Sequence, residues 1–150
     1  MVKRLLDEII QRTGVKSFDF NVNDAEPKAK ELIDKSIYHI FLARDTELET
    51  KNETEHETEV GLITLCESYS LYANGSYGLI QEFYVSPDYR SRGIGRMLLE
   101  KAKTFGASSG WKRMEVTTPP LPEFKRSLNF YQKYGFSRQG GYKLKVLLGL

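Results

Sequence analysis

The segment FYVSPDYRSRGIGR, residues 83–96, restricts the fold of this chain more than any other part of it. A β-type run ends at Val85, a Pro-Asp turn follows, and Gly93 and Gly95 precede an amphipathic run that predicts a helix. Glycines let the backbone approach a ligand closely, and the free N–H groups of a helix's first turn attract anions. Guanidinium groups suited to phosphate oxygens surround this turn, at Arg90, Arg92 and Arg96. The segment therefore predicts a pyrophosphate site between a strand and a helix.

Two other phosphate-binding motifs do not fit this sequence. A P-loop requires Gly-x-x-x-x-Gly-Lys-Ser/Thr, and the chain contains no such run. A dinucleotide-binding turn requires Gly-x-Gly-x-x-Gly, whereas Gly95 is followed by Arg96, Met97 and Leu98, with no third glycine. The alternative without a ligand is a helix N-terminus that has a glycine-rich turn and solvated arginines.

The turn resembles the acetyl-CoA-binding motif of the Gcn5-related N-acetyltransferase (GNAT) superfamily. That motif is Gln/Arg-x-x-Gly-x-Gly/Ala after a strand ending in Val-x-Pro, and here it reads Val85-Ser86-Pro87-Asp88-Tyr89-Arg90-Ser91-Arg92-Gly93-Ile94-Gly95. The family's late helix, which usually ends Phe/Leu-Tyr-x-Lys-x-Gly-Phe, is similar to Asn129-Phe130-Tyr131-Gln132-Lys133-Tyr134-Gly135-Phe136. The resemblance covers residues 60–145. It implies acetyl-CoA as the acetyl donor, held by Arg90, Ser91, Arg92, Gly93, Ile94, Gly95 and Arg96.

The resemblance also implies a fold and a path for the cofactor. The fold is mixed α/β, a central, mostly antiparallel sheet flanked by helices, as one domain over residues 1–150. In the family the strand before the turn splays from its neighbour, so we expect Phe83, Tyr84 and Val85 to contact the pantetheine arm, with a backbone N–H aimed at the thioester carbonyl. An ordinary central strand is the alternative. Family members often have Asn where this chain has Phe124, so the usual contact of that Asn with the CoA arm is missing.

Two side chains are candidates for proton transfer. Tyr131 matches the tyrosine that family members place near the CoA sulfur, and a phenol of pKa about 10 can protonate a departing thiolate of pKa about 8.5. A packed aromatic is the alternative. Glu82 lies on the strand before the turn, where many members have a carboxylate base, and Gln81 is at a neighbouring position where some carry Glu. An exposed glutamate paired with a cation is the alternative. Cys66 and His39 are expected to be structural strand residues.

The acceptor is less well defined than the donor. Six glutamates between Glu47 and Glu59 would attract a cationic amine, but a solvated hairpin connection is the simpler interpretation. The cluster of Tyr69, Tyr72 and Tyr77 would line an acceptor pocket or close the edge of the core. We expect transfer to a primary amine of a small molecule. A protein or peptide N-acetyltransferase and a non-catalytic acyl-CoA-binding domain are the alternatives.

Composition limits the other classes of partner. A net charge of +2 gives no reason to expect nucleic acid or a membrane surface. Asp7 and Glu8 interrupt the apolar stretch that a signal peptide needs, and the longest apolar runs are too short to span a bilayer. The lone cysteine cannot form an internal disulfide, and no Cys/His cluster predicts a metal site. We therefore expect a reduced, cytoplasmic protein. The resemblance leaves a homodimer open.

Periodicity predicts two helices, three strands and then the order helix, strand, helix, strand. The first helix ends at Thr13-Gly14, Asp24 caps the second, and Asn74-Gly75 forms a tight turn. The helix after the glycine turn is expected to be stopped by Gly106 and the Ser108-Ser109-Gly110 cluster, and to bury Ile94, Met97, Leu98, Ala102 and Phe105. The expected strands are residues 38–43, 59–66, 78–85, 113–118 and 143–148, and the late helix is residues 123–134.

Overall fold

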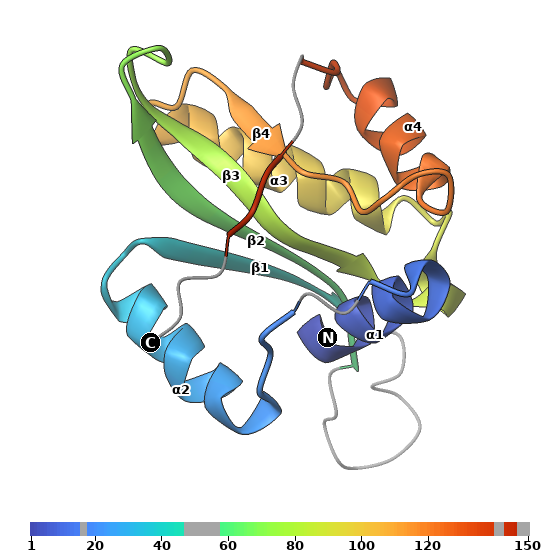
Figure 1. Cartoon of the computed structure of the whole chain (residues 1–150). Coiled ribbons are helices and arrows are strands. Elements are labelled where there is room, and N and C mark those ends of the chain that lie inside the picture. Colours follow the sequence, from blue (N-terminus) through green and yellow to red (C-terminus); the bar gives the residue numbers. More distant parts are fainter. Residues whose placement is uncertain (16–17, 47–57, 140–142, 147–150) are drawn as a thin grey trace.

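The computed structural model describes residues 1–15, 18–46, 58–139 and 143–146 (Figure 1). Its strands form a four-stranded sheet in the order β1-β2-β3-β4, antiparallel between the first three strands and parallel between β3 and β4. The predicted mixed α/β class and mostly antiparallel sheet are confirmed. The elements, in chain order, are α1 (Val2–Thr13), α2 (Val22–Asp34), β1 (Tyr38–Asp45), β2 (Thr58–Ser70), β3 (Gly75–Val85), the 3-10 helix η2 (Pro87–Tyr89), α3 (Ile94–Ser108), β4 (Met114–Val116) and α4 (Lys125–Lys133).

Different helices cover the two faces of the sheet (Figure 1). His39 and Phe41 of β1 pack against Phe105 of α3, with ring centroids 4.4 and 5.5 Å apart. α4 lies on the same face, because its residue Phe130 packs against Phe83 of β3. On the other face, α1 contacts β3 and α2 contacts β1. The sheet therefore separates an α3/α4 face from an α1/α2 face.

The main core lies between the sheet and α3, but not all of the expected residues form it. Leu98, Leu99 and Ala102 are buried there, whereas Met97 is 62% exposed, so its predicted burial was wrong. The helix continues past Gly106 and ends at Ser108, in the predicted Ser108-Ser109-Gly110 cluster. A Cβ on Gly106 would lie 2.8 Å from the ring of Trp111, so this glycine allows the indole to pack closely on α3.

The ends of several elements follow from local chemistry. α1 ends at Gly14, as predicted, with φ 70° and a hydrogen bond from its N–H to Ile10 O. α2 begins earlier than expected, because the side chain of Asn21, and not that of Asp24, caps it by accepting from the Asn23 N–H. The predicted turn at Asn74-Gly75 is confirmed, and both residues have positive φ.

The predicted last strand is not supported by the described residues. Residues 143–146 form no strand, and their apolar side chains Leu144 and Val146 are 89% and 78% exposed. Residues 147–148, the rest of that prediction, lie outside the described residues. Residues 47–57, which make up most of the acidic run, also lie outside the described residues. Thr58 and Glu59, at the end of that run, begin β2.

A β-bulge changes the orientation of side chains in the middle of β3. Ile63 of β2 pairs with Phe83 and Leu65 pairs with Ile80, so Gln81 and Glu82 together lie opposite a single residue, Thr64. Ile80 and Phe83 both pack into the core on the α3/α4 face, which strict alternation over three residues does not allow. The bulge therefore turns Glu82 toward the α1/α2 face.

β4 supports only part of β3. It pairs with Gly78–Ile80, which we call the paired half of β3, and it ends at Val116. A sequence with two adjacent prolines, Pro119 and Pro120, follows and cannot continue the ladder. Gln81–Val85, which we call the open half, is paired with β2 but not with β4. A gap in the sheet thus begins beside Gln81.

Candidate functional site

The turn before α3 has the backbone geometry of an anion site. Gly93 is the N-cap of α3 with φ 87°, and no side chain caps the helix. The first intrahelical bond runs from the Met97 N–H to Gly93 O at 3.0 Å. The N–H groups of Ile94, Gly95 and Arg96 precede it and have no acceptor within the helix. These N–H groups and the positive end of the helix dipole face the space in front of the first turn of α3, where an anion would be stabilised.

The two glycines of the turn have different roles. Gly93 needs its positive φ, and a Cβ there would meet nothing within 4 Å. A Cβ on Gly95 would make ordinary contacts, 3.5 Å from Phe130 and 3.7 Å from Phe83. Nothing inside the described chain therefore requires glycine at position 95. Its missing side chain leaves the helix N-terminus accessible from outside.

The three arginines of the turn are not equivalent. The Arg90 guanidinium binds both carboxylate oxygens of Glu8 in α1, at 3.1 and 2.6 Å, and its Nε donates to Val85 O at 2.9 Å. This pair lowers the pKa of Glu8 and raises that of Arg90. Arg92 and Arg96 are exposed. The Arg90 side chain thus fastens the turn to α1, and the other two remain available to an anion.

α4 brings a further cation to the turn that sequence reasoning missed. The Arg126 Nη2 donates to the Ser91 Oγ at 2.9 Å, although the two residues are 35 positions apart. Ser91 has φ 64°, a left-handed conformation that is uncommon outside glycine. No local pattern around Arg126 indicates this contact, because it depends on how α4 docks beside α3.

The open half of β3 presents only some of its backbone groups to the gap. The Ser86 N–H donates to Val60 O at 2.9 Å. In an antiparallel ladder every second pair of opposite residues is hydrogen-bonded, so the next hydrogen-bonded pair after Val60 and Ser86 is Leu62 and Tyr84. Phe83 and Val85 then turn their main-chain groups away from β2, toward the gap. Val85 O accepts from Arg90 there. Of the three residues predicted to meet the pantetheine arm, Tyr84 has its backbone turned toward β2 instead.

Tyr131 of α4 lies in an aromatic cluster on the α3/α4 face. It is 7% exposed, and its ring centroid lies 6.1 Å from that of Phe83 and 5.4 Å from that of Phe136. Burial raises the pKa of this phenol, so the hydroxyl stays protonated at neutral pH. Tyr131 also lines a groove of about 1160 Å³ between β4 and α4, together with Val116 and Leu128.

Glu82 lies on the opposite face of β3 in a network of side-chain hydrogen bonds. The hydroxyls of Tyr38 in β1 and Thr64 in β2 both donate to the Glu82 Oε2, and the Glu82 N–H donates to the Thr64 Oγ1 at 2.9 Å. Burial and the hydrogen bond to Glu82 raise the pKa of Tyr38. The candidate acid and the candidate base thus lie on the two faces of β3, next to the gap.

Phe124, at the position where the family often has Asn, is a packing residue. It is 5% exposed, and the Arg12 guanidinium of α1 lies 4.4 Å from its ring centroid. Arg12 also donates to Glu123 O. These contacts hold the start of α4 against the end of α1.

The residues expected to be structural have structural contacts. The Cys66 Sγ accepts from the Gln81 Nε2 at 3.0 Å, and His39 packs against Phe105 in the core. The predicted tyrosine cluster does not form one pocket. The rings of Tyr72 and Tyr77 lie 4.4 and 4.9 Å from the Arg113 guanidinium, whereas the Tyr69 hydroxyl donates to Glu67 at 2.7 Å.

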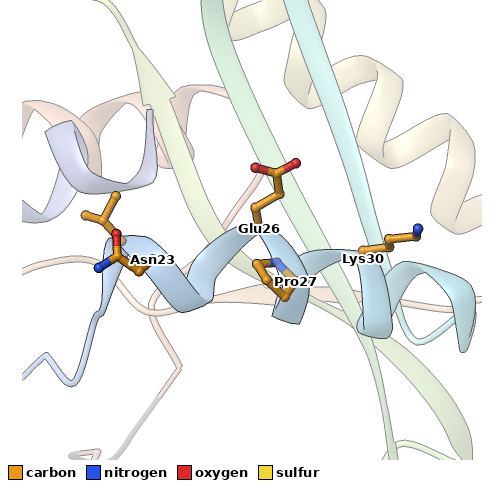
Figure 2. A pocket seen from close by; sticks show the side chains of 5 residues that line it. Asn23, Glu26, Pro27 and Lys30 are labelled. Atoms are coloured by element: carbon orange, nitrogen blue, oxygen red, sulfur yellow. The ribbon is translucent and has the colours of Figure 1, made fainter.

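A second hollow of about 570 Å³ lies on α2 (Figure 2). All of its lining residues belong to this one helix: Val22, Asn23, Glu26, Pro27 and Lys30. The hollow therefore includes no residue of the turn, of the open half or of α4. Within the described part of the chain, no helix has the length and apolar character needed to cross a membrane.

The chain belongs to the GNAT acetyltransferase family. The family model described as an acetyltransferase (GNAT) domain matches residues 36–138, which include the sheet, the turn and α4. An uncharacterised N-acetyltransferase of Methanocaldococcus jannaschii, MJ1207, is 35% identical over 60 residues. That match covers 40% of this chain and only 26% of the relative's length.

Solved structures share the fold. An integron cassette protein, HFX_CASS3, from the mobile metagenome of the Cole Harbour Salt Marsh aligns with a TM-score of 0.70 and 24% identity, over 97% of this chain and 82% of its own. An aminoglycoside acetyltransferase, meta-AAC0020, from an uncultured soil metagenomic sample, solved with trehalose, aligns with a TM-score of 0.69 and 15% identity, over 99% and 88% of the two chains. At these identities the likeness establishes the architecture alone.

Proposed function

We propose that this protein transfers an acetyl group from acetyl-CoA directly to a primary amine of a small molecule. One observation carries the proposal: the uncapped N-terminus of α3 adjoins the open half of β3, so a helix end suited to phosphate is continuous with a strand edge that β4 does not pair. A pyrophosphate joined to an extended amide-containing arm has the chemistry that fits both parts.

In this proposal each part of the turn binds a different feature of the cofactor. The pyrophosphate accepts from the N–H groups of Gly93–Arg96, and the side chains of Arg92, Arg96 and Arg126 add positive charge around it. The Arg90 guanidinium acts indirectly, because its bonds to Glu8 and Val85 hold the turn in place. The pantetheine amides pair with the main chain of Phe83 and Val85 in the gap.

The reaction occurs where the two faces of the sheet meet. The amine approaches from the α1/α2 face, and Glu82 takes its proton, directly or through a water, so that a neutral nitrogen attacks the thioester carbon. The new C–N bond forms as the C–S bond breaks, and an N–H of the open half stabilises the oxyanion. Tyr131 donates its proton to the departing thiolate from the α3/α4 face, and the proton that the new amide nitrogen loses returns Tyr131 to its phenol form through water. A buried phenol of raised pKa remains a proton donor over the whole neutral range.

Calorimetric titration with acetyl-CoA tests the cofactor site. We compare the parent chain with Gly95→Asp, which adds a negative charge at the helix N-terminus, and with Gly95→Ala, which adds only a methyl group. Repulsion between the new carboxylate and the pyrophosphate should weaken binding by about 100-fold or more. The fold should persist, because an acidic residue is favourable in the first turn of a helix. Ser108→Asp, at the other end of α3, supplies the matched charge control.

A panel of amines then tests the activity. It contains a diamine, an aminoglycoside, an arylalkylamine and a lysine peptide, and thiol release from acetyl-CoA is measured with each. Turnover with a small amine supports the proposal. Turnover with the peptide alone would make the protein a peptide acetyltransferase, and binding without turnover would make it an acyl-CoA-binding domain. Absence of acetyl-CoA binding in the parent chain would overturn the proposed function.

A further inference from the structure

We propose that Tyr38 and Thr64 are positioning residues that fix one oxygen of the Glu82 carboxylate and leave the other facing the acceptor amine. The inference rests on the proposed function, in which Glu82 is the base. It concerns two side chains that come from other strands and that the sequence did not connect with the site.

Three neighbouring strands converge at this carboxylate. Tyr38 begins β1, Thr64 lies in the middle of β2, and Glu82 belongs to the bulge of β3. The hydroxyl oxygens of Tyr38 and Thr64 lie 3.0 Å apart, and both hydroxyls donate to the Glu82 Oε2. The Thr64 Oγ1 also accepts from the Glu82 N–H, so this residue contacts both the backbone and the side chain of Glu82.

The network is fixed by packing as well as by hydrogen bonds. Thr64 is 1% exposed and therefore has little freedom to change rotamer. Tyr38 is half-buried, and its raised pKa keeps the phenol protonated and able to donate. Because both donors reach Oε2, the remaining oxygen, Oε1, is the one from which proton transfer with an amine or a water can proceed.

The two donors can be removed one at a time with little change in side-chain shape. Tyr38→Phe removes one oxygen and keeps the ring, and Thr64→Val replaces the hydroxyl with a methyl group. Either change takes one hydrogen bond from the Glu82 Oε2 and leaves the other donor in place.

The test is the ¹³C NMR signal of the Glu82 carboxyl carbon at neutral pH in protein labelled at glutamate. The signal is assigned by its loss in Glu82→Gln. Tyr38→Phe and Thr64→Val should each move this signal, because each removes a hydrogen bond to the carboxylate. Thr64→Ser, which retains the hydroxyl, should restore the parent position. Tyr69→Phe is the matched control, because its phenol donates to Glu67, outside this network.

Rates then separate this inference from the proposed function. The kcat and KM values are measured with the amine of highest rate in the panel. Tyr38→Phe should lower kcat by about 10-fold, because a hydrogen bond to a charged group is lost, and leave the KM for acetyl-CoA unchanged. An unmoved Glu82 signal in Tyr38→Phe would overturn the positioning proposal alone, as would an unchanged kcat. Full turnover in Glu82→Gln would instead reject Glu82 as the base.

Discussion

β3 has a neighbouring strand on both sides over Gly78–Ile80 and on one side only over Gln81–Val85. In the paired half, the indole of Trp111 packs on Gly78 and Gly106, and its Nε1 donates to Glu67 at 2.9 Å. In the open half, one bulge and one glycine turn leave backbone groups unpaired. The difference shows how a sheet can keep a gap: one half of β3 is packed so closely that no atom can be added, and the other has an edge that β4 leaves unpaired.

Tyr131→Phe should produce the largest effect, and only on chemistry at the open half. Loss of the phenolic proton donor should lower turnover by about 100-fold, while acetyl-CoA affinity stays the same. The free energy of unfolding should change little, because the ring and its packing against Phe83 remain. Turnover and calorimetric titration measure the two quantities. Tyr134→Phe, on the same helix, is the control; equal turnover in both variants would remove Tyr131 from the mechanism.

Methyl groups added to glycines of the two halves should give opposite results for stability. A Cβ on Gly78 would overlap the Trp111 ring, so Gly78→Ala should lower the free energy of unfolding by about 1–3 kcal/mol. Gly95→Ala, whose new contacts are ordinary, should leave it unchanged or raise it by up to about 1 kcal/mol, because alanine favours a helix. Urea unfolding compares the variants. Equal midpoints would contradict the distinction between a closely packed half and an accessible one.

Glu8→Gln should have a smaller effect that depends on pH. Arg90 lowers the pKa of Glu8 in the folded protein below its usual value of 4.5. The ion pair therefore stabilises the fold fully above pH 4.5 and loses this contribution as pH falls through the lower, folded pKa. Glu8→Gln should lower the free energy of unfolding by about 1 kcal/mol at pH 7 and change it little at acidic pH, where Glu8 is protonated. Glu100→Gln, which alters an exposed pair with Lys103, is the control. A pH-independent difference would contradict the assignment.

The sequence predicted the parts of the fold that depend on local chemistry. Gly93 and Gly95 indicated the turn and the start of α3, and Gly14 indicated the end of α1, because glycine permits backbone conformations that other residues avoid. Apolar periodicity located the strands of the central sheet. The family motif added the roles of Glu82 and Tyr131, which remain predictions.

Features that depend on tertiary contacts could not be predicted in this way. Arg90 is one of three similar arginines in sequence, and only the position of α1 shows that Glu8 binds it. The contact of Arg126 with the turn depends on the docking of α4. Alternation counted from Ile80 would place Glu82 on the core face, because a two-residue repeat cannot detect a residue added by a bulge.

The bulge separates the length of β3 from the orientation of its side chains. Side chains before Gln81 and after Glu82 follow the same two-residue repeat, but the two repeats are out of phase by one position. Deletion of Gln81 would remove the bulge and leave Glu82 alone opposite Thr64, so Phe83, Tyr84 and Val85 would keep their present sides of the sheet. The extra residue is therefore a local feature of the strand, and a chain that lacks it should still direct Phe83 and Val85 toward the α3/α4 face.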